Sequence, residues 1–127
     1  MKIYCCGCEK EIKASLTNGA DIYPHRKDLA SIPFWKCPHC GNYVGCHYKT
    51  KKPTTPLGCI PTEELRTIRS RIHSNIDPLW RSGLATRSAI YSKMSEMIGK
   101  PFHSAEIRTK EEGKTALLAA MKLVMTT

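Results

Sequence analysis

The residues best suited to chemistry in this chain are two pairs of cysteines with the same internal spacing. Cys5 and Cys8 form one C-x2-C motif, and Cys37 and Cys40 form a second, with 28 residues between the two motifs. Two residues between paired cysteines allow a tight turn to direct both sulfurs at one ion. Four thiolates in a tetrahedron suit zinc well. The spacing therefore predicts one structural Zn2+ per chain, bound by these four cysteines.

The chain has three further cysteines, and none of them is expected to bind the metal. Cys6 is a poorer partner for Cys8 than Cys5 is, because only one residue would separate the pair. Cys46 shares a predicted strand face with Val44, where a free cysteine packs as a small apolar residue. Cys59 lies in a loop and is assigned no role. The alternative that the cysteines are simply buried or redox-active remains open.

A β-hairpin is the element that must hold the second motif. Aromatic and β-branched residues precede it at 34–36 and follow it at 43–48, which predicts two strands with the motif at their tip. Gly41 after Cys40 suits such a turn, whereas Glu9 stands where the first motif would be expected to have a glycine. His47 lies on the second strand and is expected to be hydrogen-bonded or exposed, since four ligands already complete the site.

Beyond a proline-containing loop at 49–61, apolar residues recur at helical spacing and predict three helices. The first begins after Thr62 and is expected to break at Asp77, because a proline follows. The second covers 86–98 and ends at a glycine. The third begins with a capping box at 109–112, and Gly113 is expected to weaken its first turns. The positions expected to be buried are Leu65, Ile68, Ile72, Ile76, Leu79, Trp80, Ile90, Met94, Met97, Ile98, Leu117, Ala120, Met121 and Val124.

Together these patterns predict an α+β fold. A small zinc-ribbon β-hairpin module at 1–60 would pack on about three C-terminal α-helices in the region 61–127. Because a ribbon is thin, the apolar faces of the helices are expected to pack against its aromatic strands. The sequence therefore predicts one compact unit made of both regions.

Charge and composition indicate which partners and which cellular compartment suit the protein. Lys and Arg outnumber Asp and Glu by 20 to 11, giving a net charge of +9, which favours DNA, RNA or an acidic protein as partner. No stretch approaches the ~20 apolar residues of a membrane span, and the N-terminus lacks the apolar region of a secretory signal. Seven cysteines fit metal binding in a reducing compartment, so we expect a cytoplasmic protein with no membrane partner.

Several segments resemble a bacteriophage and prophage family of zinc-finger-containing domains of unknown function. They are the first C-x2-C, WKCPHCGNYVGCH at 35–47, PLG at 56–58, LRTIRSRIH at 65–73, DPLW at 77–80 and TRSAIYSKMSEMIG at 86–99. The resemblance implies a zinc ribbon, a helical C-terminal region and a phage-related origin, with a bacterial host cytoplasm as the location. It implies no reaction.

The function that the sequence favours is that of a nucleic-acid-binding accessory factor. Three aromatic residues, Trp35, Tyr43 and Tyr48, could stack on bases. Basic residues at helical spacing beside the apolar face of the first helix could contact phosphates, as could the lysines just upstream. The predicted nucleic-acid-binding residues are Lys49, Lys51, Lys52, Arg66, Arg69 and His73.

Two other functions remain open. A basic surface could instead capture an acidic protein, such as a host enzyme that the chain inhibits. A nuclease is less expected, because a four-thiolate site is closed and no motif supplies a second metal. Its best candidates would be His47, Arg69, and His73 with Asp77, four residues apart on one helix face. An enzyme is therefore the less favoured interpretation.

Overall fold

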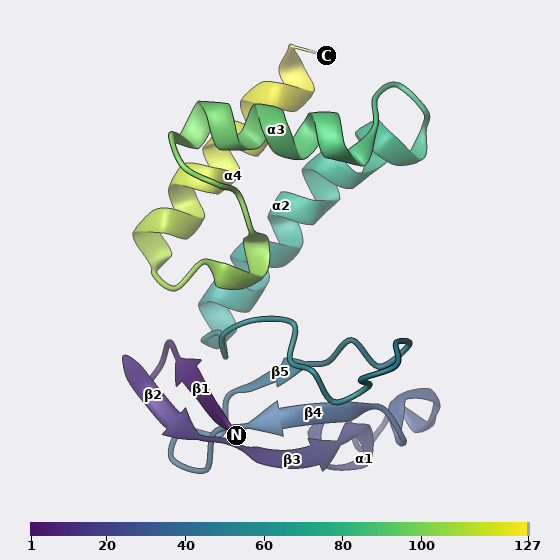
Figure 1. Cartoon of the computed structure of the whole chain (residues 1–127), viewed down its shortest axis with the longest axis vertical. Helices are drawn as coiled ribbons and strands as arrows, with labels where there is room; N and C mark the ends of the chain where they lie inside the picture. The colour runs from purple at the N-terminus through teal and green to yellow at the C-terminus, as the bar shows by residue number, and fades with distance from the viewer. Residues whose placement is uncertain (127) are drawn as a thin grey trace. The chain divides into compact units, whose positions relative to one another are not determined.

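The computed structural model describes residues 1–126 and divides the chain into two compact units, Met1–Glu63 and Glu64–Thr127. Antiparallel strands that carry the cysteines occupy the first unit, and three long helices occupy the second (Figure 1). The α+β fold class expected from the sequence is therefore confirmed. That ribbon and helices form one compact unit stays a prediction.

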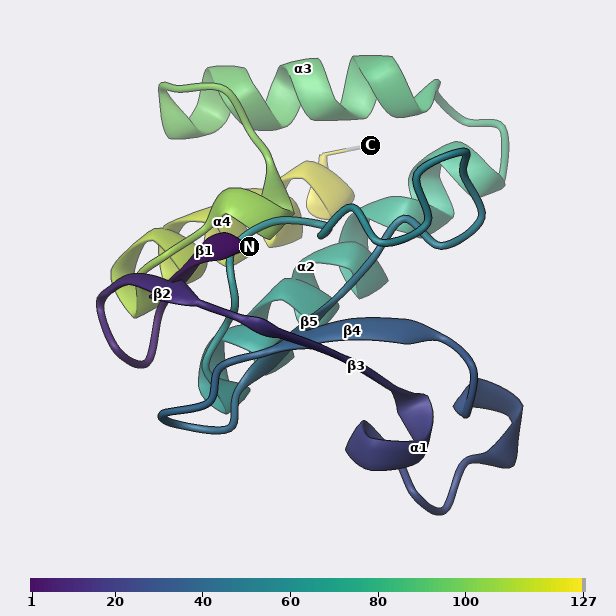
Figure 2. The same cartoon turned by 60° about the horizontal axis from the view of Figure 1, so that its bottom comes forward.

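Unit 1 contains two small antiparallel sheets. One is the hairpin β1–β2, and the other has the strand order β3-β4-β5. In Figure 2 the short helix α1 follows the end of β3, and the chain then returns into β4. The elements are β1 Lys2–Cys5, β2 Lys10–Lys13, β3 Ser15–Asn18, α1 Gly19–Ile22, the 3-10 turn η1 Lys27–Leu29, β4 Pro33–Lys36 and β5 Tyr43–Gly45.

The hairpin predicted around the second cysteine motif is present as β4 and β5. Trp35 pairs with Val44, and Lys36 pairs with Tyr43 beside the turn. The first motif also lies on a hairpin, β1–β2, in which Ile3 pairs with Ile12. The core of unit 1 packs directly beside the cysteines and consists of Ile3, Cys5, Ile12, Ala14, Cys37, Val44 and Ile60, with Cys8 and Trp35 against it.

Unit 2 is built from α2 Glu63–Arg81, α3 Arg87–Ile98, the 3-10 turn η2 Ser104–Glu106 and α4 Lys110–Met125. The predicted ends of α3 and α4 are confirmed. Thr86 and Thr109 accept hydrogen bonds from the N–H groups of Ala89 and Glu112, and Gly99 ends α3 with φ 77°. None of the helices in residues 1–126 combines the length and apolar character that crossing a bilayer requires.

The predicted break at Asp77 is wrong, because α2 continues through Pro78 to Arg81. A proline removes one helical N–H donor, but Pro78 lies in the last turn, where little helix follows it. The Pro78 carbonyl still accepts the Ser82 N–H at 3.0 Å. Continuing the helix also buries Leu79 in line with Ile72 and Ile76. One lost hydrogen bond is therefore offset by an uninterrupted apolar face.

The predicted inner face of α4 is only partly correct. Leu117 and Ala120 are buried, but Met121 and Val124 are exposed. The residues buried in their place are Gly113, Ala116, Ala119 and Leu123. Met97 of α3 is also exposed, and Trp80 is only half-buried.

Gly113 lies at the point where α4 approaches α2. A Cβ at this position would lie 2.9 Å from Cγ2 of Ile68 and 3.2 Å from Cδ1 of Leu65, both on α2. The two helices therefore approach closely at a position without a side chain. Ala116 and Ala120, further along the buried face of α4, are small as well. Gly113 is therefore a packing requirement of unit 2, and its weakening effect on the first turns of α4 stays a prediction.

We predict that Gly113→Val destabilises the protein by about 1–3 kcal/mol, because two methyl groups must enter space that Ile68 occupies. The matched control is Lys114→Val, at an exposed neighbouring position on the same helix, which should change stability by less than about 1 kcal/mol. Chemical denaturation followed by circular dichroism measures both. Equal effects of the two substitutions would contradict the close approach.

Candidate metal centre

The four cysteines singled out by their spacing lie together where two hairpin turns meet. Cys5 ends β1 and Cys8 lies in the turn to β2, while Cys37 and Cys40 lie in the turn between β4 and β5. Their four Sγ atoms are all within 4.8 Å of one another. No other group of three or more potential metal ligands occurs in residues 1–126.

The sulfur separations fit a tetrahedral metal centre. The Sγ atoms of Cys5 and Cys40 are 3.5 Å apart, and those of Cys8 and Cys37 are 3.7 Å apart. Metal–sulfur bonds of about 2.3 Å in a regular tetrahedron place neighbouring sulfurs about 3.8 Å apart. Such an ion fits between these sulfurs with little movement of the backbone.

The crowded thiols titrate unequally. Burial, reinforced by the neighbouring thiols, raises the pKa of Cys5 to about 12, and burial also raises the pKa of Cys8. Burial acts the same way on Cys37, but the N–H groups of Cys40 and His39 and the adjacent thiols lower its pKa to about 7. The protein alone therefore favours a thiolate at only one of these three positions. A bound dication would favour the thiolate form at all four.

The backbone of both turns is shaped for this cluster. Gly41, directly after Cys40, has φ 78°, and Glu9, directly after Cys8, adopts the same left-handed region at 57°. Glycine takes this conformation without strain, whereas a side chain makes it costly. Glu9 therefore adopts the same left-handed backbone conformation as Gly41, but its side chain makes this conformation strained.

Contacts around Cys40 bring the two turns together. The side-chain amide of Asn42 donates a hydrogen bond to Cys40 Sγ at 3.2 Å, which supports negative charge on the sulfur. Gly7, from the opposite turn, is so close that a Cβ there would meet Asn42 Nδ2 at 2.8 Å and Cys40 Sγ at 3.4 Å. No larger residue fits at position 7 without displacing this amide or the sulfur.

The remaining cysteines stay outside the cluster. Cys46 is buried, as expected, beside a bridge to Pro56, and burial raises the pKa of its thiol. Cys6 and Cys59 are also buried, with their Sγ atoms 3.8 Å apart. The side chain of His47 is exposed. Sequence spacing alone could not have paired Cys6 with Cys59, because they are 53 positions apart, with strands β2 to β5 between them.

The predicted nucleic-acid-binding residues fall into two sets. Lys49, Lys51 and Lys52 are exposed on the loop of unit 1 that follows β5. Arg66, Arg69 and His73 lie on α2 of unit 2, where they are half-buried. The lysines are therefore displayed to solvent, whereas the α2 residues are partly covered.

Two of the α2 side chains hold a neighbouring segment of unit 2. Arg69 donates a hydrogen bond to the Ile107 carbonyl at 2.6 Å. His73 Nε2 lies 2.7 Å from Ser104 Oγ, while its Nδ1 lies 3.2 Å from an oxygen of Asp77. Both ring nitrogens of His73 are engaged, and the arrangement ties the η2 turn to α2. His73 and Asp77, the pair considered above for a nuclease, are thus part of the hydrogen-bonded connection between α2 and η2.

We predict that Glu9→Gly stabilises the metal-loaded protein by about 0.5–1 kcal/mol, since it relieves the positive φ. Glu9→Gln removes the same charge without relieving the backbone, and should leave stability within about 0.5 kcal/mol of the parent. Urea unfolding of all three proteins tests this. A gain with Gln as large as that with Gly would show that charge, not backbone strain, matters at this turn.

Comparison with known proteins agrees with the cysteine geometry. A family described as a zinc-finger-containing domain, of unknown function, matches residues 1–124. No curated protein matches the chain, and no solved structure does. Because the match extends over almost the whole chain and includes all four clustered cysteines, this protein belongs to that family of zinc-finger-containing domains.

Proposed function

We propose that the cluster of Cys5, Cys8, Cys37 and Cys40 binds one structural Zn2+. The supporting observation is four sulfurs at separations that fit a tetrahedral centre, in a chain of the zinc-finger family. All four ligand positions come from the protein, which leaves no open position for a substrate. Zinc would therefore fix the two hairpin tips to each other rather than take part in a reaction.

Metal analysis of protein purified without added metal tests this assignment, with one zinc per chain as the expected result. Cys37→Ser should lose the metal, because a serine hydroxyl is a poor zinc ligand. Cys46→Ser is the matched control: it changes a buried cysteine outside the cluster and should retain full zinc, although we expect it to be about 1 kcal/mol less stable. Loss of zinc from Cys46→Ser, or its retention in Cys37→Ser, would overturn the ligand set.

We further propose that the protein binds nucleic acid, and that the loop from Cys46 to Ile60 carries the main phosphate contacts. Two observations support this proposal: the loop is positively charged, and hydrogen bonds hold its backbone in place. No aspartate or glutamate occurs from Leu29 to Thr62, while Lys49, Lys51 and Lys52 are all exposed. Phosphates would therefore meet three cations with no carboxylate nearby in the sequence.

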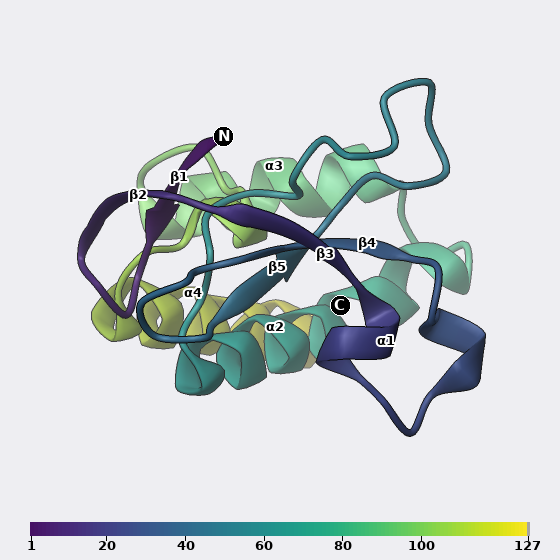
Figure 3. The same cartoon turned by 90° about the horizontal axis from the view of Figure 1, so that it is seen from below.

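The base of this loop is firmly held, although its tip projects away from the strands (Figure 3). The Trp35 indole donates to the Thr54 carbonyl at 2.7 Å, and the His47 N–H donates to the Thr55 carbonyl at 2.8 Å. At the tip, Thr50 turns the chain back by donating to the His47 carbonyl. An ordered backbone reduces the entropy lost when the lysines bind.

An exposed aromatic ring accompanies these charges. Tyr48 is exposed and its ring lies 5.7 Å from the Lys49 ammonium. Trp35 and Tyr43 are less suited to base stacking, because Trp35 packs on the core and Tyr43 packs edge-on against Tyr23 and Phe34. Of the three aromatics suggested by the sequence, Tyr48 therefore has the best access to a base.

The remaining parts of the proposal concern origin and setting. We propose a bacteriophage or prophage origin, as the sequence resemblance implies, and action in the cytoplasm of a bacterial host. Seven cysteines without a disulfide among them suit that reducing compartment. Arg66 would add a contact, whereas Arg69 and His73 already hold the η2 segment and are better left unchanged when binding is tested.

We predict that replacing Lys49, Lys51 and Lys52 together with alanine weakens binding to every oligonucleotide and lowers the salt slope by about 3. Fluorescence anisotropy at several salt concentrations from ~50 mM upward measures both quantities. The control replaces Lys93, Lys114 and Lys122, three exposed lysines on α3 and α4, with the same change in charge.

The comparison of the two triple variants decides the proposal. Equal weakening would mean that only net charge matters and that the loop is not the contact surface. No binding by the parent protein would put the alternative, capture of an acidic host protein, in first place. Strand cleavage lost in His73→Ala would instead support the nuclease.

A further inference from the structure

A second group of basic and aromatic side chains lies where α2 ends and α3 begins, and the sequence pattern did not predict it. The Arg81 guanidinium lies 5.3 Å from the centre of the Trp80 ring, and the Arg87 guanidinium lies 5.6 Å from the same ring. Arg87 also lies 5.1 Å from the Tyr91 ring and donates to its hydroxyl at 3.3 Å. We call these four residues the arginine–aromatic ladder.

A hollow of about 630 Å³ adjoins the ladder along α3. Arg87 and Tyr91 belong to the ladder and also line the hollow. Its base contains Phe102, which is buried and packs edge-on against Tyr91 with ring centres 5.2 Å apart. The full lining is Arg87, Ser88, Tyr91, Ser92, Ser95, Pro101, Phe102 and His103, and it contains no carboxylate.

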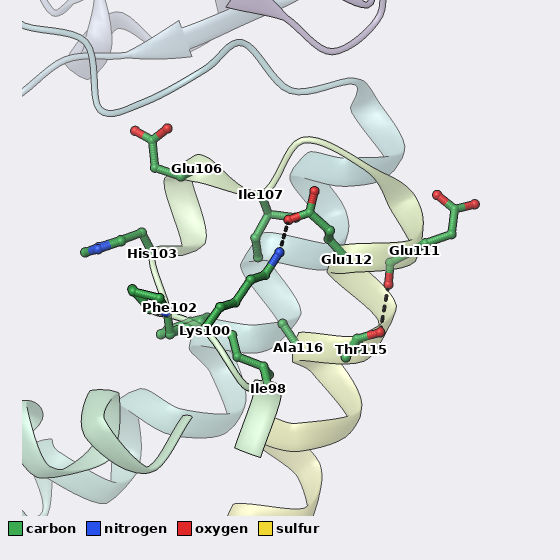
Figure 4. A pocket seen from close by; sticks show the side chains of 11 residues that line it. Ile98, Lys100, Phe102, His103, Glu106, Ile107, Glu111, Glu112, Thr115 and Ala116 are labelled. Atoms are coloured by element: carbon green, nitrogen blue, oxygen red, sulfur yellow. Dashed lines mark hydrogen bonds and ion pairs between the residues drawn. The ribbon is translucent and has the colours of Figure 1, made fainter. Parts of the chain in front are cut away.

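Another hollow of unit 2 has a different character (Figure 4). Its volume is about 540 Å³, and its lining includes Glu106, Glu111 and Glu112. Lys100 forms an ion pair with Glu112 at 2.8 Å, so the main cation of this hollow is already neutralised. A phosphate would be repelled there, whereas the hollow beside the ladder offers Arg87 and hydroxyl groups.

We propose that the ladder and its adjoining hollow bind one unstacked nucleotide of a single-stranded nucleic acid. The inference rests on the proposed nucleic-acid-binding function and gives it a second, separate contact. The base stacks on the ladder, since aromatic rings and guanidinium planes both present flat faces to a base. The phosphate is held by Arg87, with the hydroxyls of Ser88 and Ser92 beside it.

The local charges favour this ligand. Asp77 is the acidic group beside the ladder; it accepts the Trp80 indole N–H at 3.2 Å and lies 3.8 Å from Arg81. Its carboxylate also faces His73, and its field reaches Arg87. The two arginines, Arg81 and Arg87, outnumber the one neighbouring carboxylate of Asp77, so the net charge at the ladder is positive. The hydrogen bond that Arg87 donates to Tyr91 holds the guanidinium in place, and it raises the pKa of Arg87.

Single strands are favoured over duplexes for a steric reason. Bases within a duplex are stacked on both faces and cannot reach a side chain without being extruded, which costs a few kcal/mol. Bases of a flexible single strand are available at once. The loop of unit 1 lacks this discrimination, because phosphates are present on both forms.

Trp80 provides a direct reporter of the ladder. Titration of the full chain with oligo(dT) or oligo(U) should quench tryptophan emission, and a duplex at equal phosphate concentration should quench it much less. Trp80→Phe should remove the quenching that arises at the ladder, whereas Trp35, hydrogen-bonded to the base of the loop, still reports binding at the loop. Comparison of oligo(dT) with oligo(U) shows whether the natural source is DNA or RNA, since both offer a base with its phosphate.

The contact residues are tested with a charge-matched control. Arg87→Ala and Tyr91→Ala should each weaken binding of single strands by about tenfold, within the range for one stacked base. Arg87→Lys keeps the charge but loses the planar group and should recover only part of the affinity. Arg71→Ala, at an exposed position of α2, removes the same charge as Arg87→Ala and should have little effect. Thermal melting monitored by circular dichroism confirms that each variant is folded.

The outcomes separate this inference from the broader function. Equal affinities of Arg87→Ala, Tyr91→Ala and Arg71→Ala, or quenching by duplex as strong as by single strands, would overturn the ladder site. If the loop lysines still mattered in that case, nucleic-acid binding itself would stand. Failure of the parent protein to bind any oligonucleotide would overturn both.

Discussion

Convergence of four thiols between two hairpin tips is the constraint on which unit 1 depends. The pKa values of Cys5 and Cys8 are raised and that of Cys37 is lowered, so the protein alone disfavours several thiolates side by side. A bound dication would remove this conflict and link the two hairpin tips through all four sulfurs. The small apolar core lies directly beside the cysteines, so metal binding and core packing should stabilise each other. Strands this short, in sheets this small, need such support.

Unit 2 is organised by close approach of helices rather than by a bound ion. Gly113 allows α4 to pack against the stiff, branched side chain of Ile68. Beside this face of α2, polar residues perform a similar task, because Arg69 and His73 fasten the segment between α3 and α4. Basic residues in this unit therefore have two different roles. Some stabilise the helices, and others, such as Arg81, reach solvent beside an aromatic ring.

The sequence predicts correctly those features that depend on neighbouring residues, and it misses those that depend on contacts between distant segments. The C-x2-C spacing, the caps at Thr86 and Thr109, and the stop at Gly99 depend on a few neighbouring residues, and the structure has them where they were expected. The break at Asp77 and the face of α4 depend on what packs against the helix, which a local pattern does not contain. The pairing of Cys6 with Cys59, and the ladder around Trp80, depend on where distant or turning segments meet. Arg87 lies beyond a turn from Trp80, so helical spacing could not connect the two.

The narrow base of the loop after β5 has a consequence for how this protein can vary. The Trp35–Thr54 hydrogen bond and the bridge between Cys46 and Pro56 already fix the ends of the loop. With its ends fixed, a loop tip tolerates changes of length well, because each doubling of a flexible loop costs only about 0.6 kcal/mol in closure entropy. The metal centre is carried by other turns and does not use the tip. Segment 48–53 is therefore a position at which related chains could exchange one loop sequence for another, and at which a foreign peptide could be grafted, while the fold of unit 1 stays the same.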